Sequence, residues 1–305
     1  MLRQEPIRAK WHLGALGRVR DYNQLLKPNL SGMVVFSSVI GYLMAPGVHF
    51  VWNDLGTWQR IITLFTGGML VTGGANTINQ ILEKDSDALM KRTQGRPLPD
   101  GRMGTAEAWL FAALTGISGA LLLALYFNVQ AGALSFFSLL LYAFAYTPMK
   151  KVHPVAVLIG AIPGALPPLI GWVAATGEFS AGGWVLFAVQ FFWQFPHFWA
   201  IAWVAYDDYD RAGIRMLPTR ERETKFTAIQ CILYSMVLVP MATVPHMLGL
   251  TGSIGMWVCL LCGVMYLAAS IAFYVKNDYK SARRVMFASF IYLPVVLLAL
   301  VMDKM

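Results

Sequence analysis

The sequence predicts an all-α polytopic membrane protein, and three observations lead to this fold class. The chain has 305 residues, of which 57% are hydrophobic and only 13% charged. Its mean hydropathy of +0.55 is typical of a protein surrounded largely by lipid. Its apolar residues fall into nine segments, each long enough to cross about 30 Å of hydrocarbon as a helix. We therefore expect nine transmembrane helices in a single domain at 29–305, after a basic segment at 1–28.

The nine expected helices follow the apolar segments in chain order. They cover residues 30–50, 60–82, 105–127, 130–147, 154–176, 181–205, 226–246, 252–275 and 285–302. The second carries four glycines that permit close helix approach. The fifth contains Pro163, Pro167 and Pro168, and because proline cannot donate to the helix ladder we expect it to be kinked or broken around 163–168.

The distribution of basic residues predicts the orientation. Of the 24 Lys and Arg, 22 lie in the N-terminal segment or in the loops after the even-numbered helices. Only Arg60 and Lys304 belong to the other side. By the positive-inside rule the N-terminus is cytoplasmic and the C-terminus lies outside. The net charge of +8 then reflects topology and attraction to anionic membrane lipid, and we expect no nucleic-acid partner.

An acidic motif begins where the second apolar segment ends. Asn79, Glu83 and Asp87 are spaced i, i+4 and i+8, so on a continuing helix they share one face, whereas Asp85 points away. Their oxygens suit Mg²⁺, and the following Arg92 and Arg96 could clamp the oxygens of a diphosphate bridged by that ion. The competing interpretation is a charged loop with ordinary helical salt bridges.

A second acidic cluster follows the sixth apolar segment, four helices later. It contains Asp207, Asp208 and Asp210, with Arg211 next in the chain. Asp207 and Asp210 share a helical face, so spacing does not choose the ligand. A parallel duplication of four-helix units would bring both clusters to one side of the membrane, where each could hold one Mg²⁺. The alternative is an acidic cap on a cytoplasmic loop.

Three further polar residues lie at or within the apolar segments. Tyr146 and Lys150, spaced i and i+4, would place a phenol and an ammonium together at the cytoplasmic rim, although Pro148 disfavours a regular helix there. They either contact a diphosphate or anchor the helix at the interface. His197 lies inside the sixth segment. It is either a site residue, acting as a base or as a metal or porphyrin ligand, or a core histidine whose hydrogen bonds are satisfied.

The chain resembles the intramembrane UbiA prenyltransferase superfamily, and within it the branch that farnesylates protoheme. The residues that carry the resemblance are 79–98, Tyr146-Thr-Pro-Met-Lys150, the Gly/Pro-rich stretch 158–172, Trp193-Gln-Phe-Pro-His197-Phe-Trp-Ala200 and 207–218. The acidic motifs are shared across the superfamily, whereas 158–172 and 195–199 are specific to the heme branch. Two positions depart from the pattern: Glu83 stands where many relatives carry Asp, and Val204 stands where a second acid is usual.

The resemblance implies an enzyme of a bacterial cytoplasmic (inner) membrane whose site faces the cytoplasm. Its substrates would be farnesyl diphosphate and heme b, its cofactor Mg²⁺, and its product heme O; a heme A synthase is a candidate partner. Asn79, Glu83 and Asp87 match the first metal–diphosphate motif, and Asp208, complemented by Asp207 or Asp210, matches the second. The remaining site residues implied are Tyr146, Lys150, Arg92, Arg96, Arg211 and His197.

Two other functions fit parts of the sequence. A relative that prenylates a quinone precursor or a chlorophyllide would share the acidic motifs but not the segments 158–172 and 195–199. A secondary transporter would also have broken helices and polar residues at membrane depth. The acids here lie at the cytoplasmic rim beside Arg residues, which suits a fixed diphosphate better than alternating access.

Overall fold

The computed structural model describes residues 14–219 and 224–305, and its regular secondary structure is helical. The basic residues counted within 1–13 and 220–223 lie outside the described residues. The longer elements are α1 (Ala15–Leu26), α2 (Pro28–Met44), α3 (Leu55–Leu82), α5 (Thr105–Tyr126), α6 (Val129–Leu140), α8 (Ala156–Thr176), α9 (Ala181–Val204), α11 (Phe226–Met241), α13 (Ser253–Lys276) and α14 (Tyr279–Met302). Short elements join them: α4 (Lys84–Leu89), the π-helix η1 (Leu141–Tyr146), α7 (Thr147–Met149), α10 (Tyr206–Arg211) and α12 (Val244–Met247).

The predicted fold class is confirmed. Among the described residues, eight helical segments are long and apolar enough to cross a membrane. The first expected span corresponds to α2, which at 17 residues is the shorter apolar helix. The count of nine therefore depends on α2, whose length is at the lower limit for a span.

Local sequence signals set several helix ends. The carboxylate of Asp54 accepts hydrogen bonds from the backbone N–H groups of Gly56 and Thr57 and so caps α3. Asp278 and Ser281 form a capping box at the start of α14. Between α1 and α2, Lys27 adopts a left-handed conformation with φ 47°, and Pro28 then occupies the first turn of α2. This turn directs Lys27 inward.

The three prolines do not break α8, which runs continuously from Ala156 to Thr176. Pro167 and Pro168 lack the N–H groups that would bond to the carbonyls of Pro163 and Gly164. Side chains from neighbouring helices supply those donors. Ser138 Oγ donates to the Pro163 carbonyl at 3.2 Å, and Gln190 Nε2 donates to the Gly164 carbonyl at 2.8 Å. The broken helix is thus avoided because α6 and α9 satisfy the freed backbone oxygens.

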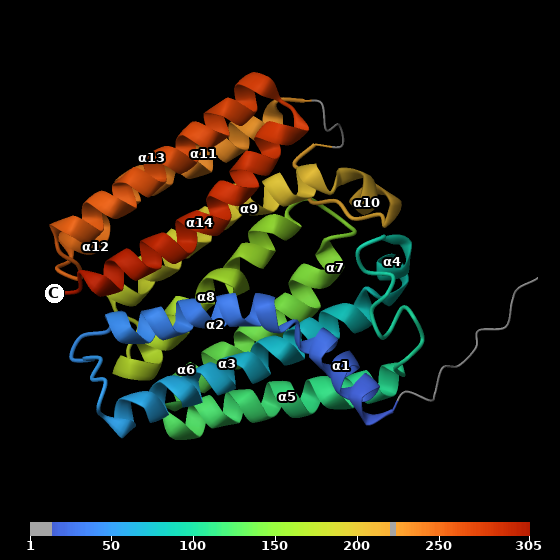
Figure 1. The fold of residues 1–305 in the computed structure, drawn as a ribbon, viewed down its shortest axis with the longest axis horizontal. Coiled ribbons are helices and arrows are strands. Elements are labelled where there is room, and N and C mark those ends of the chain that lie inside the picture. Colours follow the sequence, from blue (N-terminus) through green and yellow to red (C-terminus); the bar gives the residue numbers. More distant parts are fainter. Residues whose placement is uncertain (1–13, 220–223) are drawn as a thin grey trace, which may run out of the picture.

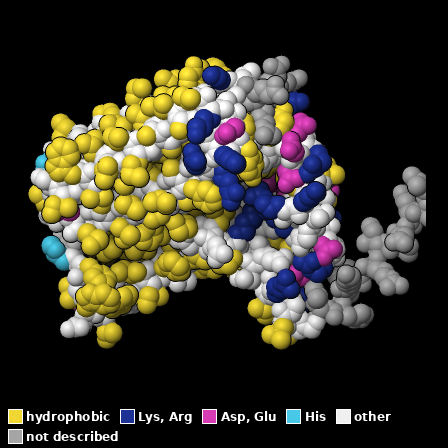
Figure 2. All heavy atoms as spheres, turned by 45° about the horizontal axis from the view of Figure 1, so that its top comes forward, with side chains coloured by type: hydrophobic (Ala, Val, Ile, Leu, Met, Phe, Trp, Pro, Cys, Tyr) yellow, Lys and Arg dark blue, Asp and Glu magenta, His cyan; other side chains and the backbone are white. Residues whose placement is uncertain are grey.

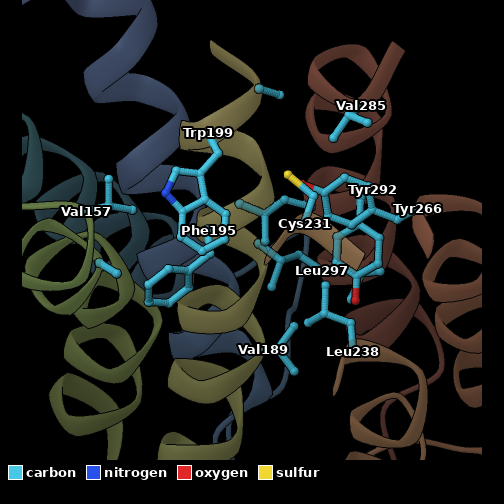
Figure 3. Close-up of a cluster of buried hydrophobic side chains, with 14 of the residues drawn as sticks. Val157, Val189, Phe195, Trp199, Cys231, Leu238, Tyr266, Val285, Tyr292 and Leu297 are labelled. Carbon is cyan, nitrogen blue, oxygen red and sulfur yellow. The ribbon is translucent and has the colours of Figure 1, made fainter. Parts of the chain in front are cut away.

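The helices form two groups that meet along α8 (Figure 1). The first group packs α3 on α5 and α2 on α8, and the second packs α9, α11, α13 and α14 on one another. Contacts of α8 with α9 and of α2 with α14 join the groups. The second group surrounds a core that includes Phe195 and Trp199 from α9 and Tyr266 and Tyr292 from the last two helices (Figure 3).

Both acidic motifs lie at the same end of the bundle. The long helices α3 and α9 are each followed by a six-residue acidic helix, α4 and α10 respectively, and these short helices lie near each other in Figure 1. Most of the Lys and Arg side chains visible in Figure 2 gather at this end, while hydrophobic side chains cover much of the remaining visible surface. The C-terminus lies at the opposite end (Figure 1). The charge asymmetry read from the sequence therefore corresponds to a physical polarity of the molecule.

Candidate active site

The first acidic motif bends at Glu83 instead of continuing one helix. α3 ends at Leu82 and α4 begins at Lys84, with Glu83 between them. The i to i+4 hydrogen bonds nevertheless persist, from Glu83 N to Asn79 O at 3.0 Å and from Asp87 N to Glu83 O at 2.7 Å. The motif therefore does not lie on one uninterrupted helix, as its spacing led us to expect. The spacing still gathers the three side chains, because the turns on both sides of the bend remain helical.

The three motif side chains are buried, and each has a defined partner. Asn79 Nδ2 donates to Glu83 Oε2 at 2.8 Å. Glu83 Oε1 lies 2.5 Å from Lys150 Nζ, and Asp87 Oδ2 lies 2.5 Å from Arg96 Nη1. Asp87 has no exposed surface. Asp85 is exposed, as predicted. Glu83 therefore meets a cation from a distant part of the chain, whereas Asp87 pairs with Arg96, nine residues further along the same segment.

Lys27 is a third cation of the site, although its place in the sequence predicts only a charge that sets the topology. Its Nζ lies 3.3 Å from Asn79 Oδ1. Burial, together with the nearby charges of Arg96 and Lys150, lowers the pKa of the Lys27 ammonium to about 7, although the carboxylates of the motif oppose this shift. Burial also lowers the pKa of Lys150, which the carboxylate of Glu83 opposes. Three basic groups thus converge on one buried acidic motif, which is an arrangement suited to an additional anion.

Tyr146 and Lys150 meet as their spacing predicts. The backbone N–H of Lys150 donates to the Tyr146 carbonyl at 3.2 Å, and Lys150 Nζ lies 4.8 Å from the centre of the Tyr146 ring. The π-helix η1 and the short α7 carry the chain past Pro148. The ammonium therefore contacts the ring face as a cation–π pair. Thr147, between them, accepts a hydrogen bond from Asn79 at 3.2 Å.

The second acidic motif lies beside the first, but its carboxylates do not join Glu83 and Asp87 in one cluster. Asp207 and Asp210 are exposed, and Asp208 pairs with Arg211 on the same short helix. On α10, burial raises the pKa of the Tyr209 hydroxyl, which the nearby guanidinium of Arg92 opposes, so Tyr209 lies beside the basic residues that follow the first motif. Behind α10, the Arg215 backbone N–H donates to the Lys150 carbonyl at 2.6 Å.

The predicted metal ligands are only partly assembled. No group of three or more His, Cys, Asp or Glu side chains within residues 14–219 and 224–305 is arranged to hold a metal ion. Glu83 and Asp87 instead form ion pairs with Lys150 and Arg96, and Asp208 forms one with Arg211. Asp87 Oδ1 is buried and has no hydrogen-bond partner in the described chain. That unpaired oxygen, with Glu83 and the Asn79 amide oxygen, is a donor set that fits Mg²⁺.

A mainly apolar cavity of about 510 Å³ adjoins this polar site. Tyr142 and Tyr146 border it toward the acidic motif, and the proline-rich part of α8 forms one wall. Leu30, Met33 and Phe290 line the cavity and are also exposed on the outer surface, so the cavity opens sideways between α2 and α14. An apolar molecule could therefore enter from the lipid while its polar end reached the cations.

His197 lies on the wall of this cavity. Its Nδ1 is 2.7 Å from Ser289 Oγ, and its ring stacks on Trp193 with the centres 4.7 Å apart. The sequence left open a site residue or a satisfied core histidine. The structure gives the imidazole one hydrogen bond to the protein and a position beside open space.

Buried cations beside an apolar cavity that opens toward lipid suit a membrane enzyme whose substrate has an anionic end and an apolar chain. Residues 34–293 match the UbiA prenyltransferase family, and the chain belongs to that family.

Within this family, the chain is similar to several protoheme IX farnesyltransferases. A protoheme IX farnesyltransferase from Cytophaga hutchinsonii is 44% identical over 93% of this chain and 97% of the relative. One from Flavobacterium johnsoniae is 39% identical over 93% of this chain and 94% of the relative. A mitochondrial protoheme IX farnesyltransferase from Arabidopsis thaliana is 36% identical, covering 96% of this chain and 67% of the plant protein.

Solved structures share the fold at low sequence identity. A digeranylgeranylglyceryl phosphate synthase has a TM-score of 0.77 at 20% identity, covering 94% of this chain and 98% of that chain. A UbiA homolog from Archaeoglobus fulgidus, bound to GPP and Mg²⁺, has a TM-score of 0.62 at 15% identity, covering 92% of this chain and 99% of that chain. These similarities concern the arrangement of helices.

Proposed function

We propose that this chain transfers the farnesyl group of farnesyl diphosphate to a vinyl group of heme b, with addition of water, to give heme O. The observation that carries the proposal is the contact between a buried cation cluster and an apolar cavity, with Tyr146 belonging to both. A diphosphate needs the first environment, while a farnesyl chain and a porphyrin need the second. The names of the relatives select heme as the acceptor.

The basic residues are assigned to the diphosphate. Lys27, Lys150 and Arg96 converge on the first acidic motif, and the charge of Arg92 lies near Tyr209 of α10. Guanidinium and ammonium donors held in a buried site stabilise the charge that develops on the leaving diphosphate. The ion pairs of Lys150 and Arg96 with Glu83 and Asp87 keep these donors in place before substrate arrives.

Asn79, Glu83 and Asp87 are assigned to Mg²⁺. When bound, the ion would neutralise diphosphate oxygens and so favour ionisation of the allylic carbon–oxygen bond. Asp208, with Asp207 or Asp210, is assigned to a second ion, and Arg211 to the same diphosphate. For that role the Asp208–Arg211 pair must open and the acids of α10 must turn toward the first motif.

The cavity residues are assigned to the apolar reactants. The ring faces of Tyr142, Tyr146 and Phe198 would shield the farnesyl cation from water until the vinyl carbon attacks. Water then adds at the carbon left electron-poor. His197 would contact the heme.

In the cell we assign the protein to the bacterial inner membrane with the cation cluster facing the cytoplasm, as the distribution of Lys and Arg favours.

The test is incubation of the purified full-length protein with heme b, farnesyl diphosphate and Mg²⁺, followed by mass analysis of the porphyrin. We expect a product heavier than heme b by one farnesyl group and one hydroxyl group, because the added water releases a proton as it forms the alcohol. Adding 4-hydroxybenzoate as a competing acceptor separates heme farnesylation from quinone-precursor prenylation. Farnesylation of the benzoate alone, or no consumption of farnesyl diphosphate as expected of a transporter, would overturn the proposal.

A further inference from the structure

The imidazole of His197 is held by a hydrogen bond and by contacts with two aromatic rings. The ring of Trp193 stacks on it with an angle of 23° between the planes, and Phe290 lies edge-on with the ring centres 5.3 Å apart. Trp193 is itself fixed, because its Nε1 donates to the Ser289 carbonyl at 2.9 Å. Ser289 therefore positions the imidazole twice, once through its hydroxyl and once through the indole that stacks on the ring.

The hydrogen bonds of Ser289 determine which nitrogen of His197 carries the proton. Ser289 Oγ donates its single hydrogen to the Met286 carbonyl at 2.5 Å. The Tyr266 hydroxyl, which also contacts Ser289, has its own acceptor in the Trp193 carbonyl at 3.4 Å. The 2.7 Å contact between Ser289 Oγ and His197 Nδ1 must then be donated by Nδ1. The neutral imidazole is consequently protonated on Nδ1, and Nε2 keeps its lone pair.

Nε2 is the nitrogen left for a ligand. Nδ1 faces Ser289 on α14, so the opposite side of the ring faces away from that helix, and His197 lines the cavity. Within the described residues the imidazole makes one hydrogen bond, that of Nδ1. Histidines that bind metals usually donate their other N–H to a fixed acceptor, which sets the tautomer and orients the ring. The Ser289 hydroxyl has this relation to His197.

We infer that Ser289 is a positioning residue that holds His197 with Nε2 directed into the cavity as an axial ligand of the heme iron. The inference rests on the proposed function only in taking heme b as the acceptor. His197 lies seven residues before the end of α9, hence about 10 Å below the polar end of the bundle. Iron bound there would place the porphyrin in the apolar cavity while the diphosphate stays with the cations above it.

The experiment is titration of the purified full-length protein with heme b in the absence of farnesyl diphosphate, followed by absorption and electron paramagnetic resonance. We expect the wild type to give the spectrum of imidazole-ligated iron and His197→Ala to lose it, with added imidazole restoring the ligation. Ser289→Ala should weaken heme binding about 10- to 100-fold or change the axial-ligand signal. Ser289→Thr, which keeps the hydroxyl, should behave like the wild type.

Ser235→Ala is the matched control, because Ser235 is also fully buried but its Oγ donates to the Cys231 and Ile232 carbonyls of its own helix and not to His197. Its heme spectrum should be that of the wild type. The inference is overturned if His197→Ala keeps the wild-type iron signal, or if Ser289→Ala and Ser235→Ala give identical spectra. Heme ligation that responds to the variants as expected, combined with farnesyl transfer only to another acceptor, would overturn the proposed function alone. Farnesyl transfer to heme with an unchanged iron signal in His197→Ala would overturn this inference alone.

Discussion

Replacing Asp87 with Asn tests the assignment of the first acidic motif most directly. The change keeps the shape and one carbonyl oxygen of a side chain that has no exposed surface, and it removes the negative charge 2.5 Å from Arg96. Hydrogen bonds to charged groups contribute about 1.5–3 kcal/mol to stability. The Arg96 side chain is 22% exposed, so water can partly rehydrate its charge, and we expect a loss near the lower end of that range.

The effect on catalysis should be larger than the effect on folding. Removing one group that stabilises charge at a preorganised site typically costs about 2.7–4 kcal/mol, or roughly 10²- to 10³-fold in rate. Asp87 would lose its role toward Mg²⁺, and Arg96 would lose the partner that orients it. We therefore expect heme O formation by Asp87→Asn to fall by about this factor, and Asp87→Ala to abolish it.

The assay measures the initial rate of heme O formation over a range of Mg²⁺ concentrations, alongside the thermal unfolding of each variant. Asp85→Asn is the control, because that acid is two residues away but exposed. An Asp87→Asn/Arg96→Gln double variant should lose less than the sum of the single losses, since the two groups act together. Wild-type rate and Mg²⁺ dependence in Asp87→Asn would refute the role given to this residue.

Three further outcomes are expected. Chelation of divalent cations should stop farnesyl transfer and added Mg²⁺ should restore it; turnover persisting in excess chelator would contradict the metal assignment. Gly41→Ala would drive a methyl carbon into the Pro168 carbonyl oxygen and should destabilise the α2–α8 contact by about 1–3 kcal/mol or more. Gly32→Ala, with nothing within 4 Å of the added carbon, should not lower the melting temperature. Lys304 donates to the backbone carbonyls of residues 43, 45 and 48 at 2.6–2.7 Å. Lys304→Met should therefore lower the free energy of unfolding by about 1.5–3 kcal/mol, while farnesyl transfer, at the other end of the bundle, keeps its rate. Equal melting temperatures would show that these bonds contribute nothing to stability.

The sequence by itself determined the order and approximate limits of the helices, because a segment crosses the lipid according to its own local hydropathy. It also placed Asn79, Glu83 and Asp87 on one face and excluded Asp85, since helical spacing fixes which side chains share a face; their burial was seen only in the structure.

Only the tertiary structure decided which cations and hydroxyls meet these residues. Lys27 approaches Asn79 across 52 positions of sequence, and Ser289 approaches His197 across 92. Neither residue carries a local signal of such a contact, because a lysine before a helix and a serine within one are common. The continuity of α8 was decided in the same way: its prolines remove backbone donors, but Ser138 and Gln190 from other helices replace them. Contacts of this kind depend on how helices pack, and that packing is the sum of many side-chain fits across the whole chain.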